Sequence, residues 1–356
     1  MSKVLVAMSG GVDSSVAAYL LQQQGYDCLG VTMRLYENEL VGQPNQQSCC
    51  SLDDVEDARA VCFRLGIRHH VFNFGESFEK EVIGRFVSEY EQGRTPNPCI
   101  ECNRHLKFDR LLQRARELGC DYIATGHYAR ITRDETGHCE LCAAPDASKD
   151  QSYVLYSLTQ EQLRHTLFPL GGLPKSEVRR IAAEQGFINA AKKDSEDICF
   201  IPDGDYAAFL ERYTGHGYPP GDFVDAAGRV LGRHKGIVRY TIGQRKGLGI
   251  AADAPLYVKK IDTATNTITL AHAEEMRFEN FEAAEVNWPG GTPAALPFTA
   301  VVAARYHARP APARIIPLEG GRRILVELAE PLRAVTPGQA VVVYEGDRVV
   351  CGGTIV

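Results

Sequence analysis

The first 125 residues alternate short apolar runs with amphipathic segments, and this alternation limits the possible folds more than any other feature. Apolar runs buried on both faces are typical of strands in a parallel sheet, whereas the segments between them have helical spacing. The predicted strands are Lys3–Met8, Cys28–Leu35, His69–Phe74 and Asp121–Thr125, and the predicted helices are Ser14–Gln24, Asp53–Leu65, Ser77–Glu91 and Leu106–Leu118. This order predicts a doubly wound, mostly parallel α/β sheet, whose ligands bind at the carboxyl ends of the strands.

The character of the chain changes after about residue 200, where glycine and proline become frequent and short β-branched segments follow one another. Before that change, a helix is expected over Leu163–Phe187, with a break at Pro169–Leu173 and a restart at Pro174. The strands expected after it are Gly236–Thr241, Leu256–Ile261, Thr267–Leu270, Phe298–Ala303, Arg323–Leu328, Ala340–Tyr344 and Val349–Val356. We therefore expect an α/β domain over residues 1–203, a small β-rich domain over 204–276 and a C-terminal β-barrel over 277–356.

Composition predicts a cytoplasmic protein without a membrane segment. No apolar run approaches the roughly 18 residues that a membrane span needs, and the apolar start is too short for a secretory signal. Eleven cysteines are an odd number scattered over a chain without an export signal, so reduced thiols are expected instead of a disulfide framework. The formal net charge of −6 argues against a protein that coats nucleic acid indiscriminately.

One stretch of the predicted β-rich domain, Ala226–Ala252, contains basic residues and no acidic ones. Such a stretch could follow a phosphate backbone, but it fits a solvated face of a β-domain equally well. Its basic residues are Arg229, Arg233, Lys235, Arg239, Arg245 and Lys246.

A glycine- and serine-rich loop, Ser9–Ser15 (SGGVDSS), falls directly between the first predicted strand and the first predicted helix. Glycines let the backbone approach an anion closely, and the start of the following helix offers free N–H groups. No Gly-Lys-Ser/Thr follows, so this is not the phosphate loop of kinases and GTPases. The loop therefore predicts a phosphate site of another kind.

Two cysteines stand in segments suited to nucleophilic chemistry. Thr95–Asn103 contains two prolines that fix its path, and it runs into the helix expected near Leu106. A thiol just ahead of a helix start, such as Cys102, should have a lowered pKa. The segment Asp194–Pro202 opens acidic and closes apolar around Cys199. Either thiol could act as a nucleophile.

Other readings of the cysteines compete. Cys99 and Cys102 have the spacing of metal ligands or of a redox dithiol, although no second pair of ligands is found near them. Cys139 and Cys142 would face opposite sides of a strand, which argues against a metal site there. Three further cysteines are expected in the core and two remain undecided; these are Cys28, Cys62 and Cys120, and Cys49 and Cys50.

The pattern SGGxDS resembles the PP-loop of ATP pyrophosphatases, which cleave ATP between the α- and β-phosphates and leave AMP on the substrate. Taken with other segments, it resembles the tRNA-specific 2-thiouridylase family over essentially the whole chain. The matching segments, in order, are SGGVDSS, TPNPCIECN, ATGHY (Ala124–Tyr128), KDQSYVL (Lys149–Leu155), DSEDICFI, GQRKGLG (Gly243–Gly249) and the pair Arg305-Tyr306.

The resemblance implies roles at the matching positions. Residues expected around ATP are Ala7, Met8, Ser9, Gly10, Gly11, Val12, Asp13, Ser14, Met33 and Gly126, with Asp13 helping to hold Mg²⁺ or to orient pyrophosphate. Residues expected to contact tRNA are Asn97, Pro98, Cys99, His127, Lys149, Asp150, Gln151, Arg305, Tyr306 and Gln339. Cys102 resembles the first catalytic cysteine of the family, and Cys199 the cysteine that carries a persulfide.

The implied reaction is sulfur transfer to the wobble uridine of tRNA. ATP would adenylate the uracil 2-oxygen, and sulfur from a Cys199 persulfide would displace AMP and leave a Cys102–Cys199 disulfide. The wobble base would have to leave its stack to enter the site. The implied partners are tRNAs for Gln, Glu and Lys and a persulfide donor, either a cysteine desulfurase or a sulfur-relay protein.

One position departs from a common pattern of the family. Many members have Asp where this chain has Cys99, so the acid/base role given to that Asp does not carry over directly. Cys99, Cys102 and Cys199 also make a set of three thiols that could hold an iron–sulfur cluster, which we keep as the minority hypothesis. Two rival functions remain: ligation of a small metabolite by another PP-loop enzyme, and nucleotide-dependent RNA binding without catalysis.

Overall fold

The computed structural model describes residues 1–36, 52–194, 198–333 and 335–356. Cys49 and Cys50, as well as the part of the second cysteine segment at positions 195–197, lie outside the described residues. In the part of the chain that the structure describes, no helix is long and apolar enough to cross a membrane.

The N-terminal part is the predicted parallel sheet with helices on both faces. The sheet has the order β3-β2-β1-β4-β7, with β1 at its centre. Its strands are β1 (Lys3–Ala7), β2 (Asp27–Arg34), β3 (Arg68–Asn73), β4 (Tyr122–Ala124) and β7 (Thr166–Leu167). Leu5 of β1 packs into one hydrophobic core, and its neighbours Val4 and Val6 pack into another on the opposite face. Successive side chains of a strand point to opposite faces, so these two cores confirm the doubly wound sheet.

Helices cover each face of this sheet. Residues of α1 (Val12–Gln23), α2 (Leu52–Leu65) and α8 (Lys175–Glu184) belong to the core that contains Val4 and Val6. The core around Leu5 contains a long helical run that is broken only between α4 and α5. This run consists of α3 (Gly75–Phe78), η1 (Glu79–Ile83), α4 (Gly84–Glu91), α5 (Pro98–Glu101), η2 (Cys102–Arg110) and α6 (Leu111–Glu117).

The structure corrects the prediction for Leu163–Phe187, in which the first helix ends at Arg164 and a short strand follows it. A capping box at Thr159 begins α7 (Gln160–Arg164) early, and the chain then enters β7, where Thr166 pairs with Ile123 of β4. The short apolar run was read as helix because edge pairing with a distant strand leaves no local pattern. The predicted restart after Pro174 is confirmed by α8.

The C-terminal half forms two β-structures, as predicted. The central sheet has the order β10-β11-β8-β9 and is preceded by α9 (Tyr206–Thr214). Its strands are β8 (Gly221–Val224), β9 (Val230–His234), β10 (Tyr257–Asp262) and β11 (Thr267–Ala271). The strand expected at Gly236–Thr241 is wrong. Gly236 has a φ of +111°, next to the backbone of Tyr218, and the chain turns there into η4 (Ile237–Arg239).

Six antiparallel strands form the C-terminal barrel, which closes where β12 pairs with both β15 and β17. They are β12 (Arg277–Asn287), β13 (Phe298–Ala303), β14 (Ala311–Leu318), β15 (Arg323–Arg333), β16 (Ala340–Glu345) and β17 (Arg348–Ile355). A hairpin of the N-terminal part, β5 (Ala129–Arg133) and β6 (Cys139–Ala143), extends the sheet of the barrel. Cys142 of β6 pairs with Arg348 of β17. Residues distant in sequence therefore share one sheet.

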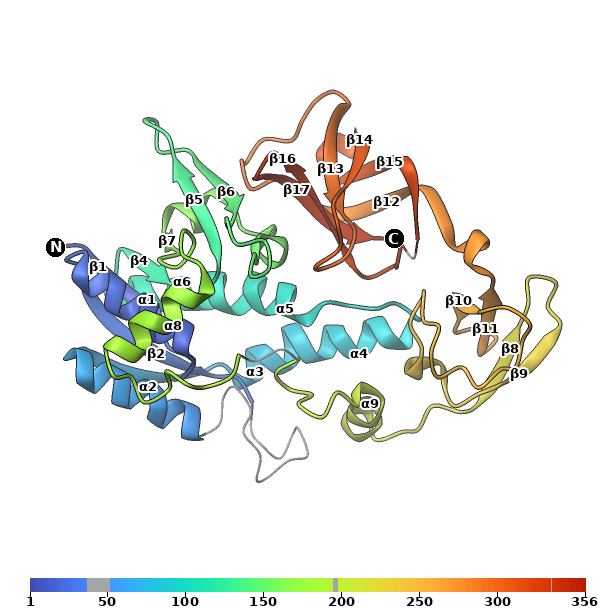
Figure 1. Cartoon of the computed structure of the whole chain (residues 1–356), viewed down its shortest axis with the longest axis horizontal. Coiled ribbons are helices and arrows are strands. Elements are labelled where there is room, and N and C mark those ends of the chain that lie inside the picture. The colour runs from blue at the N-terminus through green and yellow to red at the C-terminus, as the bar shows by residue number, and fades with distance from the viewer. Residues whose placement is uncertain (37–51, 195–197, 334) are drawn as a thin grey trace.

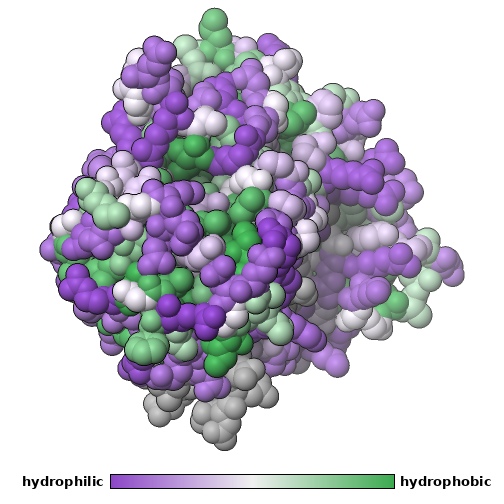
Figure 2. Space-filling view, turned by 60° about the vertical axis from the view of Figure 1, so that its left-hand side comes forward, coloured by the Kyte–Doolittle hydropathy of each residue, from purple (hydrophilic) through white to green (hydrophobic). Residues whose placement is uncertain are grey.

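The barrel lies directly on the helices that carry the first cysteine segment. Figure 1 shows α4 running beneath the barrel towards the central sheet, and the chain returning from it to α5. The Gln339 side chain donates to the Thr95 carbonyl at 2.8 Å, and the Thr95 N–H donates to the Pro337 carbonyl at 3.0 Å. An ion pair joins Arg85 of α4 to Glu285 of β12. The face of the molecule around α1, α2 and α8 is mainly polar, with small separate apolar patches (Figure 2).

A buried carboxylate at the end of α5 gives a test of this packing. Glu101 lies 3.4 Å from Arg85, 3.4 Å from Arg104 and 3.3 Å from His105. Burial raises its pKa, but these three cationic or hydrogen-bonding neighbours outweigh burial and hold it below the ordinary 4.5. Its stabilising contribution is therefore complete above pH 4.5 and is lost as the pH falls towards the lower folded-state pKa.

We expect Glu101→Gln to lower the melting temperature by roughly 5 °C at pH 7, because it removes the buried carboxylate that pairs with the partly exposed Arg85 and Arg104. The difference from the unsubstituted protein should shrink as the pH falls below 4.5, which thermal unfolding at several pH values will show. Glu117→Gln removes an exposed pair with Arg114 and should shift the melting temperature by about 1 °C at most. A difference in melting temperature that is the same at pH 7 as below pH 4.5 would contradict the lowered pKa of Glu101.

Candidate active site

A cavity of about 320 Å³ opens at the carboxyl ends of β1, β2 and β4. Its wall combines the loop after β1, the end of β2, the residues after β4, the start of the α5–η2 helix and Ile198–Phe200. The wall includes these residues expected around ATP: Ala7, Met8, Ser9, Asp13, Ser14, Met33 and Gly126. Gly10, Gly11 and Val12 belong to the same loop and helix start but are not part of the wall.

The conformation of the loop after β1 depends on a glycine and on serine hydroxyls. Gly10 has a φ of +74°, and a Cβ there would lie 2.4 Å from the Asp54 carbonyl oxygen, so only glycine fits. The Ser14 hydroxyl donates to the Gly11 carbonyl at 3.0 Å and accepts from the Ser9 N–H at 3.1 Å. These contacts hold the loop in one shape at the start of α1.

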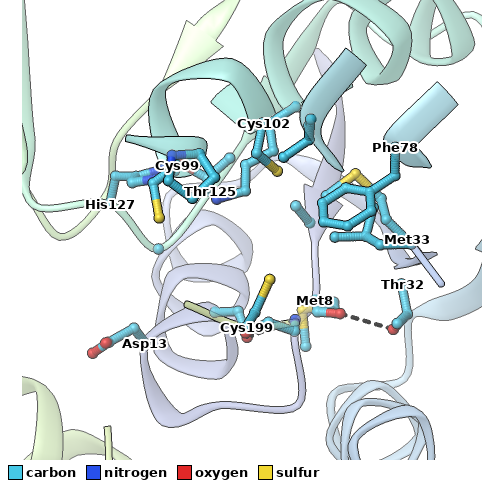
Figure 3. Close-up of a pocket in the computed structure, with 18 of the residues that line it drawn as sticks. Met8, Asp13, Thr32, Met33, Phe78, Cys99, Cys102, Thr125, His127 and Cys199 are labelled. Atoms are coloured by element: carbon cyan, nitrogen blue, oxygen red, sulfur yellow. Dashed lines mark hydrogen bonds between the residues drawn. The ribbon is translucent and has the colours of Figure 1, made fainter. Parts of the chain in front are cut away.

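Three cysteines line the same cavity as this loop. Cys99 and Cys102 come from the α5–η2 helix, and Cys199 comes from the segment that follows Asp194. Figure 3 shows their sulfur atoms directed into the common space from different sides. The structure therefore brings together two segments that the sequence placed far apart.

The helix carrying Cys102 starts earlier than expected. It begins at Pro98, where the Asn97 side chain caps it by accepting the Cys99 N–H at 3.1 Å, and not near Leu106. Cys102 consequently lies inside the helix, and Cys99 occupies its first turn. The pair Asn97-Pro98 is a typical start of a helix, with Asn as the N-cap and Pro in the first turn. The two prolines of the segment had been interpreted as a rigid loop.

Cys199 is fixed through its backbone and through the residue after it. The Tyr36 hydroxyl donates to the Cys199 carbonyl at 2.6 Å. The buried Phe200 ring packs edge-on against Phe78 at 5.6 Å and Phe86 at 5.3 Å. The apolar end of this segment is thus anchored in the core, which positions Cys199 at the cavity.

An ion-pair network beside the loop involves residues to which the sequence reasoning gave no role. The Lys175 ammonium lies 2.7 Å from Asp13 and 2.8 Å from Asp194, and its side chain is only 11% exposed. Asp194 also pairs with Arg179 at 2.8 Å and Lys149 at 2.9 Å. Partial burial raises the Asp194 pKa, but Lys175 and Lys149 outweigh it and hold that pKa below its ordinary value. The network links the loop to the start of the Cys199 segment.

Four of the residues expected at tRNA lie in the cavity wall: Pro98, Cys99, His127 and Gln151. One ring nitrogen of the buried His127 lies 2.7 Å from the Thr125 hydroxyl. Burial, with a smaller effect of Lys107, holds the pKa of His127 well below its ordinary value, so the imidazole is neutral at pH 7. Lys107 also lines the wall and was not predicted.

The remaining expected tRNA contacts lie outside the cavity wall and make contacts within the protein. Asn97 caps the helix, Lys149 pairs with Asp194, and Gln339 binds the Thr95 carbonyl. The Asp150 carboxylate accepts from Ser152, and Arg305 donates to Thr336.

Tyr306 joins the barrel domain to the segment Lys149–Leu155. Its ring packs against Tyr153 at 5.5 Å. Burial, followed by electrostatic repulsion from Asp150 and Cys99, raises the pKa of Tyr306 to about 12. Its phenol is therefore protonated at neutral pH.

Comparison with known proteins agrees with this arrangement. Three family models match in chain order: a tRNA methyl transferase HUP domain over residues 2–203, a tRNA methyl transferase PRC-barrel domain over 207–272 and an aminomethyltransferase beta-barrel domain over 278–355. The tRNA-specific 2-thiouridylase MnmA of Heliobacterium modesticaldum is 51% identical over 99% of this chain and 92% of its own length. The chain belongs to the tRNA-specific 2-thiouridylase family. The MnmA proteins of Clostridium perfringens and Clostridioides difficile are each 49% identical over 99% of this chain and 98% of their own lengths.

The three cysteines at the cavity are the candidate ligands of an iron–sulfur cluster. Among the described residues, no group of three or more His, Cys, Asp or Glu side chains is placed to hold a metal ion. Cys99, Cys102 and Cys199 line one cavity without forming such a ligand set. The residues therefore do not fit a cluster in this arrangement, and we assign it no step in the reaction.

Proposed function

We propose that the chain catalyses ATP-dependent 2-thiolation of the wobble uridine at position 34 of tRNA, giving 2-thiouridine, AMP and pyrophosphate. The observation that supports this most strongly is the shared cavity. The loop expected to hold ATP and two thiols from distant segments, Cys102 and Cys199, line the same space at the edge of the sheet. Neither a small-molecule ligase nor a simple RNA-binding protein needs two thiols at the nucleotide.

The first step activates the base. A uracil oxygen is a poor leaving group, so transfer of AMP to the 2-oxygen supplies a better one and releases pyrophosphate. Ser9–Ser14 would hold the phosphates, and Met33 and Gly126 would border the adenine and ribose. Mg²⁺, the ion expected with ATP, would be held by Asp13 and would neutralise phosphate charge. Lys175 stands next to Asp13 and adds a second positive charge.

The second step transfers sulfur. The terminal sulfur of a Cys199 persulfide attacks carbon 2 of the base, and AMP leaves. The Cys102 thiolate then attacks the Cys199 sulfur, which breaks the S–S bond, leaves sulfur on the base and forms a Cys102–Cys199 disulfide. Cellular thiols reduce this disulfide before the next cycle.

The tRNA would present its wobble base unstacked, as single-stranded loop bases are usually recognised. His127 and Gln151 would contact the base region, because both line the cavity. The basic stretch of the central domain is partly neutralised: Arg229 pairs with Asp225, and Arg239 with Glu211. The exposed residues of that stretch most available to phosphates are Lys235, Arg245 and Lys246. We further propose tRNAs for Gln, Glu and Lys as substrates, a cysteine desulfurase or relay protein as sulfur donor, and the cytoplasm as the location.

The direct test is incubation of the protein with unmodified tRNA, ATP, Mg²⁺ and a sulfur source, followed by mass analysis of the nucleosides. We expect 2-thiouridine at position 34, formed only when ATP is present. A tRNA with cytidine at position 34 is the matched control and should gain no sulfur at that position. Pyrophosphate release without any thionucleoside would contradict the proposal.

The close packing of Gly126 against the loop gives a further prediction. A Cβ at Gly126 would lie 2.9 Å from both the Asp13 carbonyl carbon and the Ser14 nitrogen, so Gly126→Ala must displace the loop. We expect the KM for ATP in tRNA-dependent pyrophosphate release to rise about 10- to 100-fold. Gly172→Ala is the control, since its Cβ meets nothing within 4 Å, and it should change KM less than about twofold. Equal KM values for both variants would show that Gly126 does not border the nucleotide.

A further inference from the structure

The cavity holds one thiol more than the proposed reaction uses. Cys99 stands three residues before Cys102 on the same helical run, and both line the cavity together with Cys199. The two differ in accessibility, because Cys99 is exposed whereas Cys102 is buried with 8% of its surface accessible. This places an accessible thiol at the mouth of the site and a buried thiol within it.

The proposed reaction creates a difficulty that this asymmetry resolves. Each cycle ends with a disulfide between buried Cys102 and partly exposed Cys199, whose neighbour Phe200 is packed in the core. Exchange requires a thiolate to approach one of the sulfur atoms, so its rate depends on access. A reductant from solution therefore reaches the Cys102 sulfur poorly. Attack on the more accessible Cys199 sulfur would expel Cys102 and leave Cys199 in a mixed disulfide, so it would not return Cys199 directly to the thiol form.

We propose that Cys99 is the resolving thiol of the reaction cycle. Its thiolate attacks the Cys102 sulfur of the Cys102–Cys199 disulfide, which releases Cys199 as a thiolate and forms a Cys99–Cys102 disulfide. The number of disulfides is unchanged in this exchange, and the proton lost by Cys99 is regained by Cys199. A small-molecule or protein thiol then reduces the Cys99–Cys102 bond at the surface. The inference rests on the proposed function, since it starts from the disulfide which that reaction leaves.

The local geometry favours this exchange. Residues three apart on a helix have side chains on the same face with about 5–6 Å between Cβ atoms, from which a small adjustment permits a disulfide. Pro98 and the Asn97 cap hold the first turn in place, so Cys99 is presented to Cys102 at high effective concentration. Moving the disulfide to Cys99 also returns Cys199 to the thiol form that accepts new sulfur.

The test follows several turnovers of persulfide-loaded enzyme with excess tRNA and ATP, a persulfide donor that reloads Cys199, and a limiting dithiol such as dithiothreitol. Samples are quenched with iodoacetamide, and the disulfides are mapped by mass spectrometry of the peptides. In the unsubstituted enzyme we expect a Cys99–Cys102 disulfide with Cys199 alkylated or persulfidated. In Cys99→Ser we expect a Cys102–Cys199 disulfide to accumulate.

Kinetics give a second readout within each variant. For Cys99→Ser, later turnovers should be roughly tenfold slower relative to its own first turnover than in the unsubstituted enzyme, and excess dithiol should remove this lag. Comparison within one variant cancels any change in tRNA affinity. Cys120→Ser, a buried cysteine outside the cavity wall, should keep the unsubstituted ratio.

The outcomes are distinct. If the unsubstituted enzyme accumulates only the Cys102–Cys199 disulfide, or if Cys99→Ser keeps the unsubstituted ratio, Cys99 is not the resolving thiol. The disulfide map of the unsubstituted enzyme decides the question even if Cys99→Ser binds tRNA poorly. If the unsubstituted enzyme forms no 2-thiouridine in its first turnover, the proposed function itself fails.

Discussion

Cys199→Ser should lower the rate of tRNA thiolation by about 10³-fold or more, because an alcohol cannot carry a persulfide. The backbone of this position is held by the Tyr36 hydroxyl and by the packing of Phe200, so the serine side chain should occupy the same place in the cavity. The nucleotide loop is untouched. We therefore expect one round of tRNA-dependent pyrophosphate release to continue without sulfur transfer.

The matched variant is Cys102→Ser, which removes the other thiol of the proposed pair. Incubation with a ³⁵S-labelled persulfide donor should label Cys102→Ser but not Cys199→Ser, whereas neither variant should complete turnover. Measurement of protein-bound label, pyrophosphate and 2-thiouridine separates the two roles. Thiolation of tRNA by Cys199→Ser at the unsubstituted rate would rule out the persulfide at this position and would revive the small-molecule ligase alternative.

Lys175→Met should reduce kcat for tRNA-dependent pyrophosphate release by about 10²- to 10³-fold. The largely buried Lys175 ammonium lies between the carboxylates of Asp13 and Asp194. Its loss would remove the positive charge that offsets Asp13 beside the phosphates of ATP, whereas Asp194 would keep its pairs with Arg179 and Lys149. The site would then repel the negative charge of the phosphates, which it has to stabilise during AMP transfer. A radiometric or coupled assay of pyrophosphate, with melting temperature as a check on folding, measures the effect.

Arg179→Met is the control because Arg179 pairs with Asp194 at 2.8 Å and makes no ion pair with Asp13 among those of the described residues. Its loss should lower kcat by about tenfold at most. Lys175→Arg keeps the positive charge but changes the shape of the side chain, so its kcat should lie between those of Lys175→Met and Arg179→Met. Equal losses for Lys175→Met and Arg179→Met would indicate that the network supports the fold and not the nucleotide.

The parts of the fold that were predicted correctly have local patterns in the sequence. Apolar runs gave β1 to β4 within a residue or two, and β-branched segments gave most strands of the barrel. The errors occurred where a distant contact decides the conformation. β7 exists because Thr166 pairs with Ile123, and the chain bends at Gly236 because its backbone packs against Tyr218. Neither partner is near in sequence.

The same distinction applies to the site. The loop SGGVDSS could be recognised because its glycines and serines act within a few residues of one another, as the Ser14 contacts with Ser9 and Gly11 show. Lys175 was missed because its partner Asp13 is far away in the chain. The position of Cys102 relative to the helix start was predicted wrongly although the Asn97 cap was visible, since the adjacent prolines favoured a loop reading equally well.

By itself the sequence determined which chemical groups the protein has and which strands and helices present them, because hydrophobic periodicity, capping and glycine conformations act over short stretches of chain. Only the tertiary structure decided which of those groups meet. The sheet and its anchored segments bring the nucleotide loop, Cys99, Cys102 and Cys199 to one cavity, and they place Lys175 between two carboxylates. These contacts depend on the packing of residues that are distant along the chain, and no local sequence pattern predicts that packing.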